Sequence, residues 1–182
     1  MRESAIILLV LLMAACTMTT AGHPAACKKD STQRAAIAGS FSIGFRYPPM
    51  PAGVEDLGGF LVMPKNGHET ELAIAIVRDK KGIVIWLDQI IYRNGCPNPD
   101  YVILDYRRVP PLANNEKLSH NCRAGDVSDG GDGLTIAVAR DQNSEVHRNI
   151  RLSWRVDVEA RRLVEISPAG IQCINDGFLE RE

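Results

Sequence analysis

Three aspartates recur at every third position of a glycine-rich segment, residues 125–133: Asp126, Asp129 and Asp132. Carboxylates on a flexible loop can wrap a calcium ion, which prefers oxygen ligands. The spacing differs from the EF-hand loop, whose acidic ligands fall at alternate positions and end in a glutamate. The segment therefore has two interpretations, a calcium site formed by the three aspartates or a hydrated turn before a strand. No motif for another cofactor is present.

Nucleophilic and metal-dependent catalysis have little support in the sequence. Ser42 lies in Ser-Phe-Ser-Ile-Gly, which lacks the first glycine of the Gly-x-Ser-x-Gly elbow. There is no phosphate-binding Walker loop, dinucleotide fingerprint or His-Glu-x-x-His helix. His120 stands two residues before Cys122, but the closely spaced ligand pairs of structural zinc sites are missing. Carboxylates on separate strands could still converge without leaving a motif.

The cysteine count indicates disulfides. Beyond residue 16 the chain holds Cys27, Cys96, Cys122 and Cys173, an even set that in an oxidising compartment predicts two bridges. Three pairings are possible. Cys96 follows an Asn-Gly pair and precedes a proline, and Cys122 follows a polar run, so both resemble loop positions. This favours Cys96 with Cys122, and leaves Cys27 with Cys173 to tie the N-terminal arm to the C-terminus.

The first residues have the pattern of an export signal. One arginine precedes an unbroken apolar run from Ala5 to Ala15, followed by Cys16. This run is well short of the roughly 20 residues that span a bilayer, so a cleaved signal is favoured over a permanent membrane helix. Export places the remaining cysteines outside the reducing cytoplasm.

The end of this run, Leu-Met-Ala-Ala-Cys, resembles the lipobox of bacterial lipoproteins, with methionine where leucine is commonest. The resemblance implies that Cys16 is lipidated, becomes the new N-terminus and holds the protein on the periplasmic side of a membrane or in the outer membrane. The alternative is ordinary cleavage after Ala21, which would give a secreted or soluble periplasmic protein. We expect a signal peptide over 1–15, a flexible tether and arm over 16–39, and a single β-rich domain over 40–182.

Strand patterns dominate after residue 40. The segment 150–157 alternates apolar and polar residues, as in a strand with one buried face, and Asp79 to Gly82 suits a tight hairpin turn. Strands are predicted at 41–47, 71–78, 82–91, 101–109, 134–140, 150–157, 163–166 and 171–174. Helix is expected only as short turns near 32–38 and 114–118. Trp86 and Trp154 are interpreted as core aromatics. The predicted fold is mainly β, an antiparallel β-sandwich or open barrel braced by disulfides, with little helix.

The longest stretch without a strand pattern, residues 110–133, is predicted to be a recognition loop because long loops in compact domains are usually functional or disordered. With the Cys96 region held beside it by the favoured disulfide, a polar contact face is expected. Its predicted members are Asn94, Asn98, Tyr101, Asn114, Asn115 and Lys117. The alternative is a pinned surface loop without a partner.

Two functions remain open. The net charge of −1 and the absence of a basic block argue against nucleic acid. The favoured hypothesis is a non-enzymatic, lipid-anchored envelope protein that binds another exported protein, as an inhibitor, an immunity-type partner or an assembly accessory. The other is a small periplasmic hydrolase or carbohydrate-active domain, which would require two carboxylates about 5 to 10 Å apart in a cleft.

Overall fold

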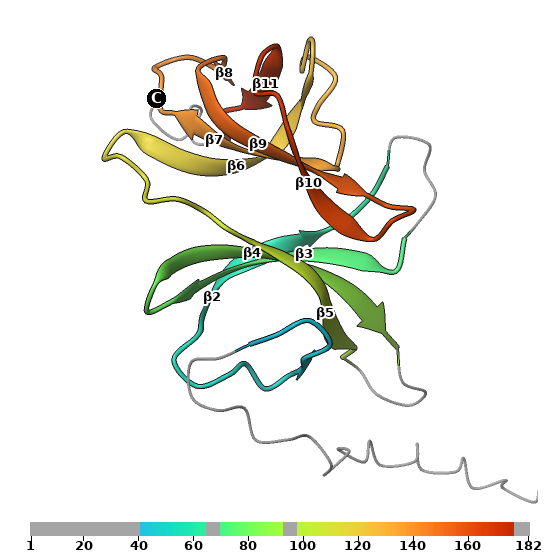
Figure 1. Ribbon diagram of the computed structural model, residues 1–182. Helices are drawn as coiled ribbons and strands as arrows, with labels where there is room; N and C mark the ends of the chain where they lie inside the picture. The colour runs from blue at the N-terminus through green and yellow to red at the C-terminus, as the bar shows by residue number, and fades with distance from the viewer. Residues whose placement is uncertain (1–40, 65–69, 93–97, 177–182) are drawn as a thin grey trace, which may run out of the picture.

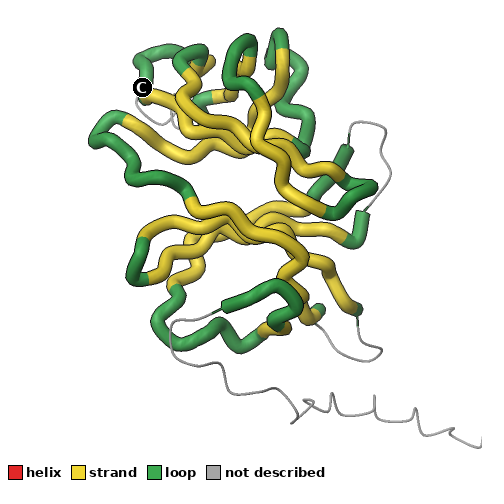
Figure 2. The backbone as a smooth tube through the Cα atoms, in the orientation of Figure 1, coloured by secondary structure: helices red, strands yellow, loops and turns green. Residues whose placement is uncertain are grey.

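The computed structural model of the chain describes residues 41–64, 70–92 and 98–176. These segments form strands and loops without a helix, as Figure 2 shows. The strands make two antiparallel sheets that pack face to face (Figure 1). The predicted antiparallel β-sandwich with a disulfide is therefore confirmed. The predictions for Cys16, Cys27, Asn94 and Cys96, and for a helical turn near 32–38, lie outside the described residues.

Sheet A, drawn as the lower layer in Figure 1, has the order β1, β5, β4, β3, β2. Its strands are β1 (Arg46–Tyr47), β2 (Glu55–Leu61), β3 (Leu72–Asp79), β4 (Gly82–Ile91) and β5 (Asp100–Arg108). β3 and β4 form the predicted hairpin, with Asp79 opposite Gly82. β4 is the central strand of the sheet, which explains its almost continuous apolar sequence.

Sheet B, the upper layer, has the order β10, β9, β7, β6, β11, β8. Its strands are β6 (Glu116–Ala124), β7 (Thr135–Arg140), β8 (Val146–His147), β9 (Ile150–Asp157), β10 (Arg162–Ile166) and β11 (Ile171–Ile174). Leu152, Trp154 and Val156 of β9 face sheet A, as the alternation predicted. Ile150 does not share that face, because a register irregularity follows it and it packs with the disulfide cysteines on the other side of sheet B, where Ser153 is also buried.

The core between the sheets is built from alternating strand positions. Ile85 and Leu87 of β4 pack there with Trp154 of β9, and all three are buried. Trp86 is fully buried as well, but on the opposite face of β4. Both tryptophans are thus core aromatics, as predicted, and they belong to different cores.

A crossing segment covers the outer face of sheet A. Because β1 pairs with β5 at one side of the sheet and β2 pairs with β3 at the other, residues 48–54 must cross the face between them. In Figure 1 the segment 41–54 lies beneath sheet A, on the face turned away from sheet B. Its side chains, including Phe41 and Tyr47, pack on Trp86 to form a second apolar core. We call residues 41–54 the strap.

Two sequence predictions are wrong in the same way. The stretch 110–133 is not an irregular loop, because it contains β6, and Asn114–Leu118 is not helical, because Asn114 and Asn115 form a turn and the strand begins at Glu116. The buried side chains of β6 include Ser119 and Cys122, and a register irregularity separates these two residues. Small buried residues and a bulge remove the apolar alternation by which strands are recognised.

Candidate functional site

The free edges of the two sheets are candidate contact surfaces. A strand at the edge of a sheet presents unpaired N–H and C=O groups to any chain that can lie beside it. Within the described residues the edges are β1 and β2 in sheet A, and β8 and β10 in sheet B. β1 and β8 have 2 residues each, so β2 and β10 are the two edges long enough to accept a further strand.

The β10 edge is closed by side chains of β5 from the other sheet. The main-chain N–H of Leu163 donates to Asp105 Oδ2 at 2.8 Å, and Arg107 Nη2 donates to the Leu163 carbonyl at 2.6 Å. Asp105 and Arg107 also form an ion pair at 2.8 Å. Both outward main-chain groups of Leu163 are therefore occupied, which is one way in which proteins protect an edge strand.

Among the described residues, no side chain is bonded to the outward main-chain groups of Leu61 at the β2 edge, and Gly133 lies against the Met63 carbonyl just beyond the strand. The N–H of Val62 donates to the Leu72 carbonyl at 3.0 Å, and Leu61 is opposite Ala73 in the same ladder. Because hydrogen-bonded and non-bonded pairs alternate along antiparallel strands, the N–H and C=O of Leu61 point away from β3. Leu61 therefore presents main-chain groups at an edge where sheet A ends.

The side chains of β2 are also unusually exposed and apolar for an edge. Exposure reaches 54% for Leu61 and 58% for Met63, just beyond the strand, and 37% for Leu57. Phe60 and Val62, at the intervening positions, pack into the core between the sheets. The alternation anchors β2 through one face and leaves leucine and methionine on the other.

A bulge limits the regular part of this edge. The register shifts between Asp56 and Gly59, and Gly58 has a φ of 110°, a conformation that favours glycine. Gly59 lies so close to β3 that an added Cβ would stand 2.2 Å from the Ile74 carbonyl oxygen. The regular edge therefore runs from Gly59 onward. At the other end Glu55 is paired with Arg78 at 2.8 Å.

A buried carboxyl lies under the strap. Asp88 of β4 is fully buried, and Tyr47 Oη donates to its Oδ2 at 2.6 Å. Among the described residues, neither its Oδ1 nor the indole nitrogen of Trp86, two residues away on the same strand, has a hydrogen-bond partner. Burial raises the pKa of Asp88 to about 7, against the smaller lowering effect of the Tyr47 hydrogen bond. No sequence motif marks this residue, and a lone aspartate in an apolar strand was its one visible signal.

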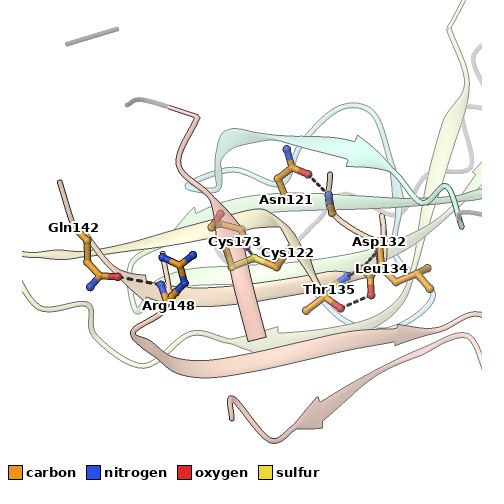
Figure 3. The surroundings of a disulfide bond; sticks show 10 residues. Asn121, Cys122, Asp132, Leu134, Thr135, Gln142, Arg148 and Cys173 are labelled. Carbon is orange, nitrogen blue, oxygen red and sulfur yellow. Dashed lines mark hydrogen bonds between the residues drawn. A yellow bond between two sulfur atoms is a disulfide. The ribbon is translucent and has the colours of Figure 1, made fainter. Parts of the chain in front are cut away.

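The disulfide differs from the favoured pairing. Cys122 of β6 bonds to Cys173 of β11, directly opposite in the ladder, so the predicted Cys96–Cys122 and Cys27–Cys173 pairs are wrong (Figure 3). The error follows from placing Cys122 in a loop. Cys122 is in a strand, and a cysteine directly opposite it on the paired strand is close enough to form a disulfide. The participation of Cys122 and Cys173 in a disulfide is confirmed.

The three aspartates do not converge. Asp132 accepts hydrogen bonds from the N–H groups of Leu134 and Thr135 and from Thr135 Oγ1, at 2.8 to 2.9 Å (Figure 3), and pairs with Arg155 at 2.9 Å. Asp126 accepts bonds from Ser128 at 2.9 and 3.0 Å. In the part of the chain that the structure describes, no group of three or more potential metal ligands is found. The local hydrogen bonds of Asp126 and Asp132 are those expected when this segment is a turn before a strand.

The predicted contact face is not assembled on one surface. Asn98 is exposed just before β5, and Tyr101 of β5 stacks on Tyr47 with ring centroids 5.3 Å apart. Three further members, Asn114, Asn115 and Lys117, follow the far end of β5, and Lys117 Nζ donates to Asn175 Oδ1 at 2.6 Å. The seven residue steps from Tyr101 to the end of β5 correspond to roughly 23 Å. The two groups therefore belong to different ends of the molecule.

A shallow hollow on sheet B offers no paired carboxylates. It is lined by Gln142, Arg148, Asn149, Ile150, Pro168, Ala169 and Gly170. The side-chain oxygen of Gln142 is already used, since it accepts the main-chain N–H of Arg148 at 3.0 Å. The described residues that line this hollow therefore include no pair of carboxylates of the kind that a glycosidase-type mechanism uses.

The sequence matches no protein-family model, no curated protein and no solved structure. In the described segments, no helix has the length and apolar character needed to cross a membrane.

Proposed function

We propose that this protein is an exported, lipid-anchored envelope protein that binds an extended segment of a partner protein along the edge of β2. The single observation that carries the proposal is the contrast between two edges. Asp105 and Arg107 occupy the outward main-chain groups of Leu163 in β10, whereas no side chain in the described part of the chain occupies those of Leu61 in β2. Strand addition uses such an edge, with main-chain bonds providing affinity and alternate side chains providing specificity.

The chemistry of β2 indicates what kind of segment it accepts. Leu61 and Met63 offer apolar contacts at alternate positions on the regular part of the edge. A complementary segment is extended and carries apolar side chains at alternate positions. Export by the leader and anchoring at Cys16 would place this edge among envelope proteins.

A matched pair of proline variants tests the proposal. Leu61→Pro removes an outward N–H from the β2 edge, and Glu165→Pro does the same at the closed β10 edge, since Glu165 lies two residues after Leu163 and shares its orientation. The full exported chain and both variants are used to capture proteins from envelope extract.

The proposal expects a protein that is retained by the wild-type chain and by Glu165→Pro but lost with Leu61→Pro. Equal retention by Leu61→Pro, or no retained protein, contradicts it. Circular dichroism and urea unfolding show that each variant is folded before the comparison is made.

A further inference from the structure

The closure of the strap over sheet A depends on a few identified contacts. The N–H of Gly44 donates to the Ile103 carbonyl at 2.7 Å, and the N–H of Ile103 donates to the Phe45 carbonyl at 3.0 Å. Tyr47 continues the attachment, with its ring stacked on Tyr101 and its hydroxyl bonded to Asp88. The strap is thus held to β5 by main-chain bonds and to β4 by one charge-sensitive side-chain bond.

The environment of Asp88 suits a neutral carboxyl and penalises a charged one. An ionised carboxylate in a dry site needs several donors or a cation. Within the described segments, Tyr47 is the only hydrogen-bond donor to Asp88. The nearest cation along the strap, Arg46, is paired with Asp100 at 2.6 Å. In the ladder, β3 places Ala73 opposite Asp88 and β5 places Ile103 there.

The other titratable groups near this pair do not relieve the charge. Tyr101 of β5 interacts electrostatically with Asp88 and with Tyr92. Asp56 of β2 interacts electrostatically with Tyr47. None of these groups is a cation. Burial, followed by the charge of Asp88, raises the pKa of Tyr47 far above its ordinary value, so Tyr47 stays protonated and remains a donor throughout the neutral range.

We propose that residues 41–54 form a pH-sensitive latch, closed over the outer face of sheet A while Asp88 is neutral and loosened when Asp88 ionises. Loosening lets water solvate the carboxylate and the unpartnered Trp86 nitrogen, so both polar atoms gain the partners that the closed form denies them. The affected surface is the apolar face around Trp86. The latch does not depend on the binding role of β2, because it is defined by the strap contacts alone.

Amide hydrogen exchange measured by NMR tests this proposal on the full exported chain between pH 5.5 and 8.5. Protection factors, corrected for the intrinsic pH dependence of exchange, are compared for Gly44 and Ile103. Val156, whose N–H donates to the Leu134 carbonyl in sheet B, is the internal reference. The proposal expects protection at Gly44 and Ile103 to fall by about tenfold or more as Asp88 ionises, and protection at Val156 to stay constant.

Two variants separate the latch from general loosening. Asp88→Asn keeps a neutral acceptor for Tyr47 and is expected to make protection at Gly44 independent of pH. Tyr47→Phe removes the hydrogen bond that Tyr47 donates to Asp88 and that favours its ionised form, so the transition should move to higher pH. Constant wild-type protection, an unchanged transition in Asp88→Asn, or no movement in Tyr47→Phe overturns the proposal. If Asp88→Asn does not fold, Tyr47→Phe still tests the proposal, because it shifts the midpoint pH at which Gly44 and Ile103 lose protection.

Discussion

Asp105 Oδ2 accepts the main-chain N–H of Leu163 at 2.8 Å, so a side chain of one sheet closes the edge of the other. Arg107 completes the closure by donating to the Leu163 carbonyl. Both residues extend from β5, which lies next to the edge of sheet A. The β10 edge is thus protected by side chains, whereas the main-chain groups of the β2 edge are exposed in the described structure. This contrast is the reason for proposing β2 as the binding edge.

Removing the closing carboxylate should cost stability. We expect Asp105→Ala to lower the free energy of unfolding by about 1 to 3 kcal/mol, since the Leu163 N–H loses its partner in a partly buried place. Urea unfolding at pH 7 measures the change, and light scattering reports any self-association through the opened edge. Glu159→Ala, at an exposed position in the β9–β10 turn, is the control and should change stability by less than about 0.5 kcal/mol. Equal effects of the two substitutions would show that the closure contributes nothing.

Asp88 should make stability depend on pH in an uncommon direction for a carboxyl. Its pKa in the folded protein is about 7 against an ordinary value of 3.8, so between these values the folded protein keeps a proton that the unfolded chain has lost. Stability therefore falls as pH rises through this window, by up to about 4 kcal/mol, and levels off above pH 7. Asp88→Asn should remove this slope, as measured by urea unfolding at pH 4.5, 6 and 8.

Asp79 provides a control of opposite sign. Its hydrogen bonds from Arg108, at 2.7 and 2.9 Å, hold its pKa below the ordinary value. Its contribution to stability is therefore present above about pH 4 and is lost as the pH falls further. Asp79→Asn should destabilise the protein at pH 7 and have a smaller effect in acid. A parallel pH response of the Asp79→Asn and Asp88→Asn variants would contradict the assigned environments.

The sequence predicted the fold wherever apolar residues alternate or run together. Residues 82–91 and 150–157 are strands at the predicted positions, because burial of one or both faces imposes a visible pattern. β2 was missed because it contains Gly58 and Gly59 and turns leucine toward solvent, and β6 because Ser119 and Cys122 fill its buried positions. Edge and bulged strands are held mainly by main-chain hydrogen bonds and bury fewer apolar side chains. Their alternation of apolar and polar residues is therefore weak.

The candidate site was less predictable than the fold. An open edge is defined by which strands pair, and the Asp105–Leu163 closure joins residues 58 positions apart. The Tyr47–Asp88 contact spans 41 positions. Neither has a local motif, whereas the predicted contact residues were chosen for local polarity. Polarity identified exposed positions such as Asn98 and Asn114 but could not show that they lie at different ends of the molecule.

The disulfide between β6 and β11 should stabilise the folded protein. Cys122 and Cys173 are separated by 51 positions, and closing a loop of this length restricts the unfolded chain by about 4 kcal/mol in the chain-entropy treatment. We expect the double variant Cys122→Ser, Cys173→Ser to lose stability of this order in urea unfolding under oxidising conditions. Reducing agent should remove the difference in stability between the wild type and the double variant, because Cys122 and Cys173 are then unbridged in both. Equal stability of the oxidised wild type and the double variant would contradict this role.

The anchor prediction is tested by phase partition. Lipidated Cys16 should carry the wild-type chain from the expressing bacterium into the detergent phase of a Triton X-114 separation, while Cys16→Ala should leave it in the aqueous phase. Cys27→Ala is the matched control and should partition like the wild type. A wild-type chain that is aqueous and begins at residue 22 would show that ordinary cleavage after Ala21 occurs instead.

The measurement that tests the central claim most directly is amide exchange along β2 in the complex with a captured partner. Strand addition must place a hydrogen-bond acceptor on the outward N–H of Leu61, so exchange at Leu61 should slow by about tenfold or more on binding, while Leu163, already bonded to Asp105, should change little. A partner that binds at full occupancy and leaves exchange at Leu61 unchanged would contradict the account.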